Sequence, residues 1–317
     1  MLDIQYIELS FKQSKLLNME KRFQSLSLFE FQERFPDDQA CMEYLASIKW
    51  PGGFHCEKCT HPKYCKGKLE QTRQCTSCGY QATPTSGTLF HKVKFPLLKA
   101  FYIIYFMSTN KKGVTSTELS RKLNLRQKTC WYFRKKVTQA MKSSKQYPME
   151  GIVEIDEMVI GQQEEDVKGR ENDKKKLVIV AIEKKGKGVS RMYARVVKNG
   201  SKQAFKPFFE EHISKKAEIR TDGWSTYKSF KKEYPNLIQV KSGKKGENFN
   251  DMHRVIMMLK GWMRGMHHSV DHLQDYLDEY AYRFNRSAMD GAIFDNLLTR
   301  AVRHSPVPYK YNHRLSA

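Results

Sequence analysis

Apolar residues recur every three or four positions in much of the first half of the chain, which is the spacing of one face of a helix. Residues 26–48 fit two short helices separated by Pro36-Asp37-Asp38, and residues 96–107 fit one buried helix. Residues 116–141 fit two more helices with a turn at Asn124 between them. The pattern therefore predicts several short helices in this half.

Beyond Tyr147-Pro148 the pattern changes to apolar and β-branched runs typical of strands. Three strands are predicted at residues 152–160, 177–182 and 189–197, followed by a helix at about 202–212, a strand at 217–221 and helices from 250 onward. This order of strands and helices is that of an RNase H-like α/β domain. The segment 161–176 has no apolar pattern and is predicted to be a solvated loop.

Four of the seven cysteines form two pairs with the same internal spacing. The pairs are separated by fifteen residues and consist of Cys56, Cys59, Cys75 and Cys78. Two knuckles with this spacing can place four thiolates tetrahedrally around one Zn²⁺. A site closed by four thiolates is structural rather than catalytic, so the sequence predicts a structural zinc ribbon.

Charge narrows the class of partner. The chain carries 56 Lys and Arg against 34 Asp and Glu, a formal net charge of +22. With 40% hydrophobic residues it has enough apolar residues for a packed interior, and no run approaches the roughly 20 apolar residues of a membrane span. Nucleic acid is therefore the first candidate partner and an acidic membrane surface the second.

The positive charge is densest over the two helices around Asn124. Residues 111–145 contain eleven Lys or Arg and one acid, Glu118, which suits a helix-turn-helix with its second helix in a major groove. A generic basic helical hairpin is the alternative. The cations predicted to contact DNA are Lys128, Arg134, Lys135 and Lys136.

Two aspartates lie where α/β sheets place chemistry. Asp156 lies inside the apolar run 152–160, and Asp222 ends the strand at 217–221, where Gly223 permits a tight exit. Two acids on adjacent strand segments can hold Mg²⁺ or Mn²⁺, which activates water and orients a phosphodiester. The alternative is that each is an ordinary turn or surface acid.

The two acids belong to a series of motifs in a defined order. They are Glu154-Ile155-Asp156-Glu157, Thr221-Asp222-Gly223-Trp224, His253-Arg254-Val255-Ile256, Leu259-Lys260-Gly261-Trp262, Gly265 to Val270 and Tyr276 to Arg286. With the ribbon and hairpin, they resemble bacterial insertion-sequence transposases related to Merlin elements, from about residue 20 to 286. The resemblance implies a DDE-type enzyme of RNase H fold that nicks transposon ends and joins the freed 3′ hydroxyl to target DNA with Mg²⁺ or Mn²⁺. It assigns the first two acids to Asp156 and Asp222.

The third position departs from a plain DDE pattern. His253 stands seven residues before Lys260, where many relatives carry Glu. Imidazole is a poor ligand for Mg²⁺ but is acceptable to Mn²⁺, and it can instead orient the nucleophile or protonate the leaving oxygen. Glu247 is a rival ligand just upstream. Lys260 and Arg264 are predicted to contact DNA.

The predicted organisation has five parts. These are a helical segment at 1–50, the zinc ribbon at 51–95, the helix-turn-helix region at 96–147, the catalytic domain at 148–290 and a tail at 291–317. The resemblance implies a bacterial cytoplasmic protein, at the nucleoid when bound to double-stranded DNA, acting on transposon ends and target as a homodimer or larger synaptic complex without a membrane. The alternatives are a DNA-binding regulator with a decayed catalytic core and a nuclease without strand transfer.

Overall fold

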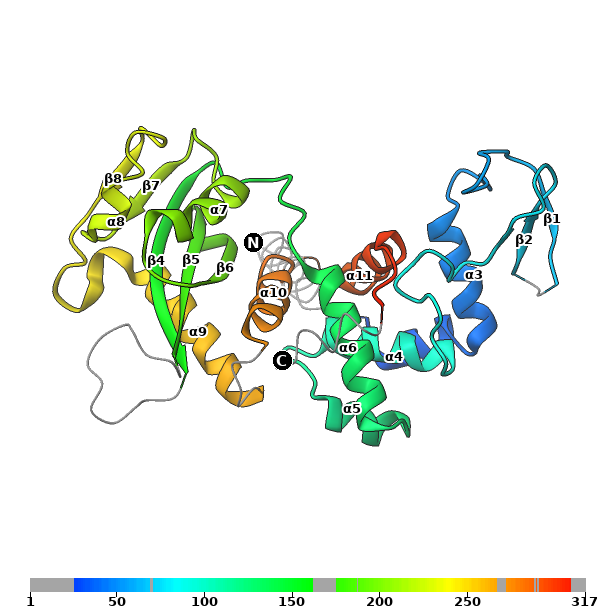
Figure 1. Cartoon of the computed structure of the whole chain (residues 1–317). Helices are drawn as coiled ribbons and strands as arrows, with labels where there is room; N and C mark the ends of the chain where they lie inside the picture. The colour runs from blue at the N-terminus through cyan, green and yellow to red at the C-terminus, as the bar shows by residue number, and fades with distance from the viewer. Residues whose placement is uncertain are drawn as a thin grey trace, which may run out of the picture. The chain divides into compact units, whose positions relative to one another are not determined.

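The computed structural model describes residues 26–68, 71–161, 175–186, 188–266, 272–287, 289 and 291–308. These residues fold as two units, a helical unit up to Ala140 and from Arg286 onward, and an α/β unit from Met141 to Asn285. Figure 1 shows the elements of each unit. In the described part of the chain, no helix has the length and apolar character needed to cross a membrane.

The helical unit contains the short helices that the sequence predicts. They are α2 (Leu28–Arg34), α3 (Asp38–Lys49), α4 (Leu97–Thr109), α5 (Ser116–Leu123), α6 (Gln127–Met141) and α11 (Ala292–Arg303). A capping box between Ser27 and Glu30 begins α2, and the Asp37 side chain caps α3. The cap of α5 is Thr115, and Asn124 ends that helix in the left-handed conformation.

Helix α11 is where the structure differs from the predicted tail at 291–317. Phe294 is fully buried, and its ring lies 5.6 Å from that of Phe31 and 6.4 Å from that of Phe101. Asp295 pairs with Arg34 at 3.0 Å. A segment with this apolar face needs a partner, and α3 and α4 provide it. The described part of 291–317 is therefore mainly a core helix, not a tail.

The zinc-ribbon segment forms a small antiparallel sheet between α3 and α4. Its strands are β1 (Tyr64–Lys66), β2 (Arg73–Cys75) and β3 (Gln81–Ala82), paired in that order. Its buried cluster contains Trp50, Phe54 and Ala82 together with two cysteines. The sheet is too short to bury much apolar surface by itself.

The α/β unit is built on a five-stranded sheet of order β6-β5-β4-β7-β8. The strands are β4 (Ile152–Gly161), β5 (Lys175–Lys185), β6 (Gly188–Val197), β7 (Glu218–Thr221) and β8 (Leu237–Gln239). The first three are antiparallel neighbours, whereas β7 and β8 run parallel to β4. This is the RNase H-like α/β arrangement predicted from the sequence, with β8 as a short fifth strand that the sequence pattern does not reveal.

Helices cover both faces of this sheet. One buried cluster contains Val153 and Ile155 of β4 with the phenylalanines of α7 (Lys202–His212) and with Tyr227 of α8 (Ser225–Lys228). The other contains Met158 of β4 with α9 (Asn250–Met266) and α10 (Leu273–Phe284). Alternation along β4 thus directs successive side chains to different helices.

Candidate functional site

The two predicted aspartates meet where β4 and β7 separate. These strands are parallel, and their last paired residues are Ile155 and Thr221. Asp156 and Asp222 each follow the last paired residue, so they lie at the same level of the sheet. Because β7 ends there, the edge of β4 beyond Ile155 is no longer paired with β7 and leaves room for side chains.

A third carboxylate joins them. One oxygen each from Asp156, Glu157 and Asp222 lies within 4.8 Å of the other two, and all three residues are partly buried. Carboxylate oxygens are the donors that Mg²⁺ and Mn²⁺ prefer, so the donor set of this cluster fits such an ion. Sequence reasoning missed Glu157 because alternation places its side chain on the opposite face of β4 from Asp156.

Contacts from α8 fix Glu157. The Tyr227 hydroxyl donates a hydrogen bond of 2.9 Å to Glu157 Oε2. Burial first, and then the negative charges of Glu157, Asp156 and Asp222, raise the pKa of Tyr227 well above its ordinary value. Tyr227 therefore keeps its proton and remains a donor to the cluster.

Asp222 is fixed by the turn that follows β7. Its Oδ1 accepts a hydrogen bond of 3.0 Å from the backbone N–H of Trp224. Gln239 of β8 donates to the carbonyl oxygens of Asp222 and Trp224, at 3.1 and 2.9 Å. Trp224 itself packs edge-on against Phe205 and Tyr227.

Neither predicted third ligand is part of the described carboxylate cluster. Glu247 is exposed in the 3-10 helix η1 (Lys244–Phe249). His253 lies on α9 and is half-buried, with its imidazole directly above Gly246, where a Cβ would come within 1.9 Å of the ring. Gly246 also has a φ of +74°, so this residue has two reasons to be glycine. The assignment of the third position stays a prediction.

The four predicted zinc cysteines lie together. One sulfur from each lies within 4.8 Å of the others, with Sγ–Sγ distances of 3.6 Å for Cys56–Cys78, 3.5 Å for Cys59–Cys75 and 3.4 Å for Cys59–Cys78. Four thiolates at about 2.3 Å from one Zn²⁺ would be about 3.8 Å apart, so the residues present fit that ion. The backbone N–H of Lys58 donates to Cys56 Sγ at 3.4 Å.

The pKa values of two thiols in this cluster are shifted in opposite directions. At Cys75 burial opposes ionisation, but N–H groups of Cys78 and Ser77 and the neighbouring sulfurs lower the pKa to about 7. At Cys78 an N–H from Tyr80 favours the thiolate, but burial and three neighbouring sulfurs raise the pKa to about 12. The first proton is thus lost readily, whereas full ionisation needs a cation at the centre.

The predicted DNA-contacting cations do not share one environment. Lys128 and Arg264 are exposed, and Lys136 and Lys260 are half-buried. Arg134 and Lys135 are buried, at 7% and 5% exposure, and their contact with DNA stays a prediction. Both lie on other sides of α6 than Phe133 and Val137, so this helix is buried on more than one side. His267 and His268 lie outside the described residues.

Comparisons with known proteins found matches to two domains of this chain. The model of the ISXO2-like transposase domain, a DDE domain of the IS1595 type, matches residues 148–285, and the transposase zinc-ribbon domain of the same type matches residues 36–81. The crystal structure of a pre-cleavage Mos1 transpososome holds a similar chain, with 10% identity and a TM-score of 0.27, over 65% of this chain and 78% of that one. No curated protein matches the chain. With both domains in this order, the chain belongs to the IS1595 family of insertion-sequence transposases.

Proposed function

We propose that the chain is an active DNA transposase that binds terminal inverted repeats and catalyses DNA cleavage and strand transfer with Mg²⁺ or Mn²⁺. The observation that carries this proposal is the carboxylate cluster of Asp156, Glu157 and Asp222, whose oxygens lie within 4.8 Å of one another. Three carboxylates repel one another, so holding them together destabilises the sheet. A bound cation would offset that repulsion. A decayed core would have no reason to keep them together.

Asp156 and Asp222 would hold the metal, which supplies activation of water or of a 3′ hydroxyl and stabilises both oxygens of an in-line displacement. Glu157 adds negative charge beside them, and its hydrogen bond from Tyr227 fixes the direction of its carboxylate. The parallel register of β4 and β7 fixes the separation of the two aspartates, because neither strand can slide without breaking its ladder.

His253 has the third catalytic role in this proposal. Close contact with Gly246 restrains its imidazole, and Asp251 on the same turn of α9 pairs with Arg254 at 2.8 Å. A neutral imidazole can ligate Mn²⁺ or orient the nucleophile, whereas a protonated imidazole can donate to the leaving oxygen. Glu247 is the competing assignment, and its exposure in η1 makes it the weaker one.

The rest of the chain would bind DNA. Zn²⁺ held by the four cysteines would stabilise the ribbon, and the hairpin of α5 and α6 would contact terminal repeats. Exposed Lys128 and Arg264 and half-buried Lys260 offer cations to phosphates of transposon ends and target. Transposition holds two ends together, so we infer a homodimer or larger synaptic complex, acting at the bacterial nucleoid in the cytoplasm.

The test is an end-cleavage and joining assay with the purified chain, Mn²⁺ and a duplex of the repeat that flanks the coding region. We expect the parent to cut and join this duplex. Asp156→Ala and Asp222→Ala should abolish both steps, and His253→Ala should be nearly inactive, whereas Glu247→Ala should retain activity. Glu218→Gln is the matched control, because Glu218 lies on β7 at a partly exposed position and pairs with Arg220 rather than with the described carboxylate cluster.

Each alternative has its own signature in this assay. Specific binding without any cleavage by the parent would indicate a regulator with a decayed core. Cleavage without joining would indicate a nuclease. If Glu247→Ala is inactive while His253→Ala remains active, the third ligand is Glu247.

A further inference from the structure

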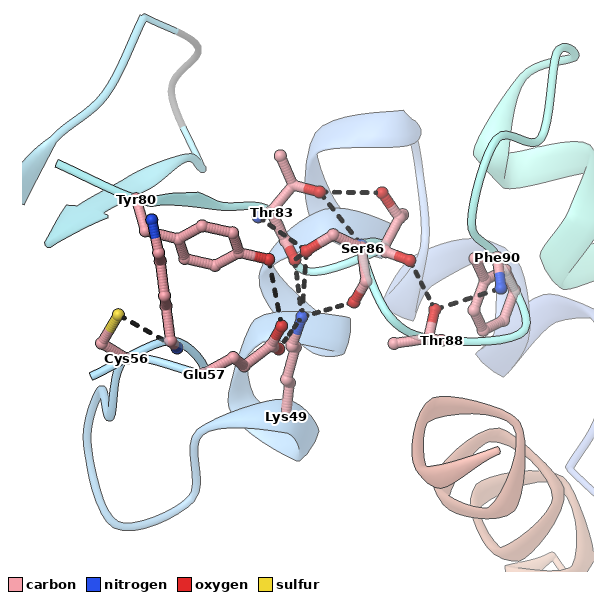
Figure 2. Close-up of polar contacts among 10 residues, drawn as sticks. Lys49, Cys56, Glu57, Tyr80, Thr83, Ser86, Thr88 and Phe90 are labelled. Atoms are coloured by element: carbon pink, nitrogen blue, oxygen red, sulfur yellow. Dashed lines mark hydrogen bonds and ion pairs between the residues drawn. The ribbon is translucent and has the colours of Figure 1, made fainter. Parts of the chain in front are cut away.

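A buried lysine connects the zinc knuckle to the helical unit (Figure 2). Lys49, the last residue of α3, has a side chain that is only 10% exposed. Its ammonium group lies 2.9 Å from the carbonyl oxygen of Thr83 and 2.5 Å from that of Ser86, with the Ser86 hydroxyl at 3.2 Å. These oxygens satisfy a cation that would otherwise be costly to bury.

The fourth contact of this ammonium group is with the zinc centre's own loop. Glu57 stands between the ligands Cys56 and Cys59, and its Oε1 pairs with Lys49 Nζ at 2.9 Å. The other oxygen, Oε2, accepts a hydrogen bond of 3.2 Å from Tyr80, which follows the second knuckle. One carboxylate therefore ties both knuckles to the end of α3, as Figure 2 shows.

The segment held by Lys49 continues into the core of the helical unit. Thr83 and Ser86 bond reciprocally, each backbone N–H donating to the other's hydroxyl oxygen at 3.1 and 3.0 Å. The Thr88 hydroxyl then accepts from the N–H of Phe90 at 3.1 Å. The Phe90 ring lies 6.1 Å from that of Phe133 on α6. A continuous set of contacts thus runs from the zinc knuckle to the predicted recognition helix.

We propose that Lys49 and Glu57 are positioning residues that couple the zinc centre to residues 83–90 and, through Phe90, to α6. With zinc bound, the knuckle holds Glu57 in place, Glu57 holds Lys49, and Lys49 fixes the turn at residues 83–86. The ribbon and the hairpin are then presented to DNA at one fixed separation. The DNA part of this inference rests on the proposed function, but the coupling itself does not.

Hydrogen exchange of the full-length chain tests the coupling without DNA. The quantity to measure is the ratio of amide exchange rates in residues 83–90 with zinc removed by a chelator to those with zinc bound. We expect a ratio of about tenfold in the parent and close to one in Lys49→Met and in Glu57→Gln. The matched control is Lys58→Gln, an exposed cation of the same knuckle, which should keep the parent ratio.

Zinc content must be measured in each variant, because Glu57→Gln should still bind one ion per chain. Glu57 is partly exposed, so this variant should fold even if Lys49→Met does not. A parent ratio retained in zinc-loaded Glu57→Gln would overturn the proposal. An exchange-rate ratio near one in the parent would also overturn the proposal.

A DNA arm then tests the consequence. Five base pairs inserted between the ribbon and hairpin contacts rotate one by half a turn of the duplex. The parent should lose at least tenfold in affinity for the respaced repeat, whereas both variants should bind both spacings nearly equally. Equal spacing penalties in parent and variants would reject a fixed separation. Absence of any DNA binding would reject the proposed function and leave the exchange result to decide the coupling.

Discussion

The two clusters of candidate metal ligands are built in opposite ways. The four cysteines lie in or beside two turns of a ribbon whose strands are two or three residues long and whose buried cluster includes two of these cysteines. The three carboxylates lie on a sheet with three strands of ten or eleven residues, buried on both faces. We therefore expect the ribbon to need a bound metal to fold, and the sheet to hold its acids together without one.

Because the two clusters are built differently, we expect removal of zinc and removal of Mg²⁺ or Mn²⁺ to have different effects. Loss of zinc should disorder a domain, because the thiolates are a large part of what holds it together. Loss of Mg²⁺ or Mn²⁺ should leave the fold intact and remove only chemistry.

Cys75→Ser should abolish stable zinc binding, because three remaining ligands cannot close the site and about 10 kcal/mol of metal-coupled folding energy depends on closure. Zinc content measured by elemental analysis should fall from one ion per chain to nearly none. Hydrogen exchange of β4 and β5 should not change. Cys65→Ser is the control, since Cys65 is an exposed cysteine outside the cluster and its variant should keep the ion.

Asp156→Asn should reduce cleavage by at least about 1000-fold, through loss of a metal ligand rather than loss of fold. In the parent, Mn²⁺ at a hundred times its dissociation constant should stabilise the α/β unit by about 3 kcal/mol, and the variant should lose this stabilisation. Urea unfolding with and without Mn²⁺ measures it. Equal stabilisation of parent and variant would show that the metal binds elsewhere.

His212→Gln should remove a pH dependence of the α/β unit. His212 is stacked on Tyr193, and burial, followed by the charge of Arg195, lowers its pKa to about 4 from 6.5. The unfolded state binds this proton first, so His212 costs stability as pH falls from about 6.5 to 4. We expect the parent to lose about 1–3 kcal/mol more than the variant over that range in urea unfolding.

A buried carboxyl group acts in the opposite direction in the same unit. Burial raises the pKa of Asp278 to about 6, so its protonated form stabilises the fold below that pH and this contribution is lost as pH rises from about 4 to 6. The free energy of unfolding of the parent therefore varies less with pH than either group alone would make it. Only the difference between parent and His212→Gln isolates the histidine, and a difference that does not vary with pH would contradict its buried neutral state.

Tyr227→Phe should weaken the acid cluster more gently than loss of an aspartate. It removes a hydrogen bond to a carboxylate, which costs about 1–3 kcal/mol, and leaves the ring packed against Phe205. Cleavage should fall about tenfold, with a larger loss in Mg²⁺ than in Mn²⁺, because Mg²⁺ demands stricter geometry. The ratio of the two rates is the informative measurement, since mere destabilisation would reduce both rates equally.

Lys128→Gln should have the smallest effect, a reduction of the salt slope of DNA binding by about one unit with an unchanged thermal midpoint. Arg134→Gln, on the same helix but buried, should instead lower the midpoint and leave the slope nearly unchanged. DNA affinities measured between 50 and 200 mM salt distinguish the two variants, because phosphate contacts weaken strongly over this range. If Arg134→Gln alone lowered the slope, the buried arginine would have to emerge to contact DNA.

Sequence reasoning found residues that lie together in the structure where a site is local. The zinc cysteines are readable because each pair has the short spacing that a metal knuckle requires. Asp156 is readable because it lies in a strongly apolar strand, and Asp222 because it ends a short strand before Gly223. It failed at Glu157, since strict alternation does not allow for the open edge of β4 beyond Ile155. Nor did it reveal that Arg134 is buried, because helical charge alone does not show which sides of a helix are covered.

Two elements of the fold were beyond a local reading. Strand β8 is only three residues long and pairs with β7, so its identity depends on a neighbour rather than on its own pattern. Helix α11 has a clear apolar face, but nothing in its sequence indicates that α3 and α4, far away in the chain, cover it. Tertiary packing decides both, and it is not encoded in short windows.

Helix α11 also determines when the helical unit can be finished during synthesis. A ribosome releases α2 to α6 early, but Phe31 and Phe101 lack the Phe294 ring until the whole catalytic domain has been translated. Prematurely terminated chains would therefore carry an incomplete helical core and should be cleared by proteases rather than occupy DNA ends. The order of translation thereby favours molecules that carry both units of the chain.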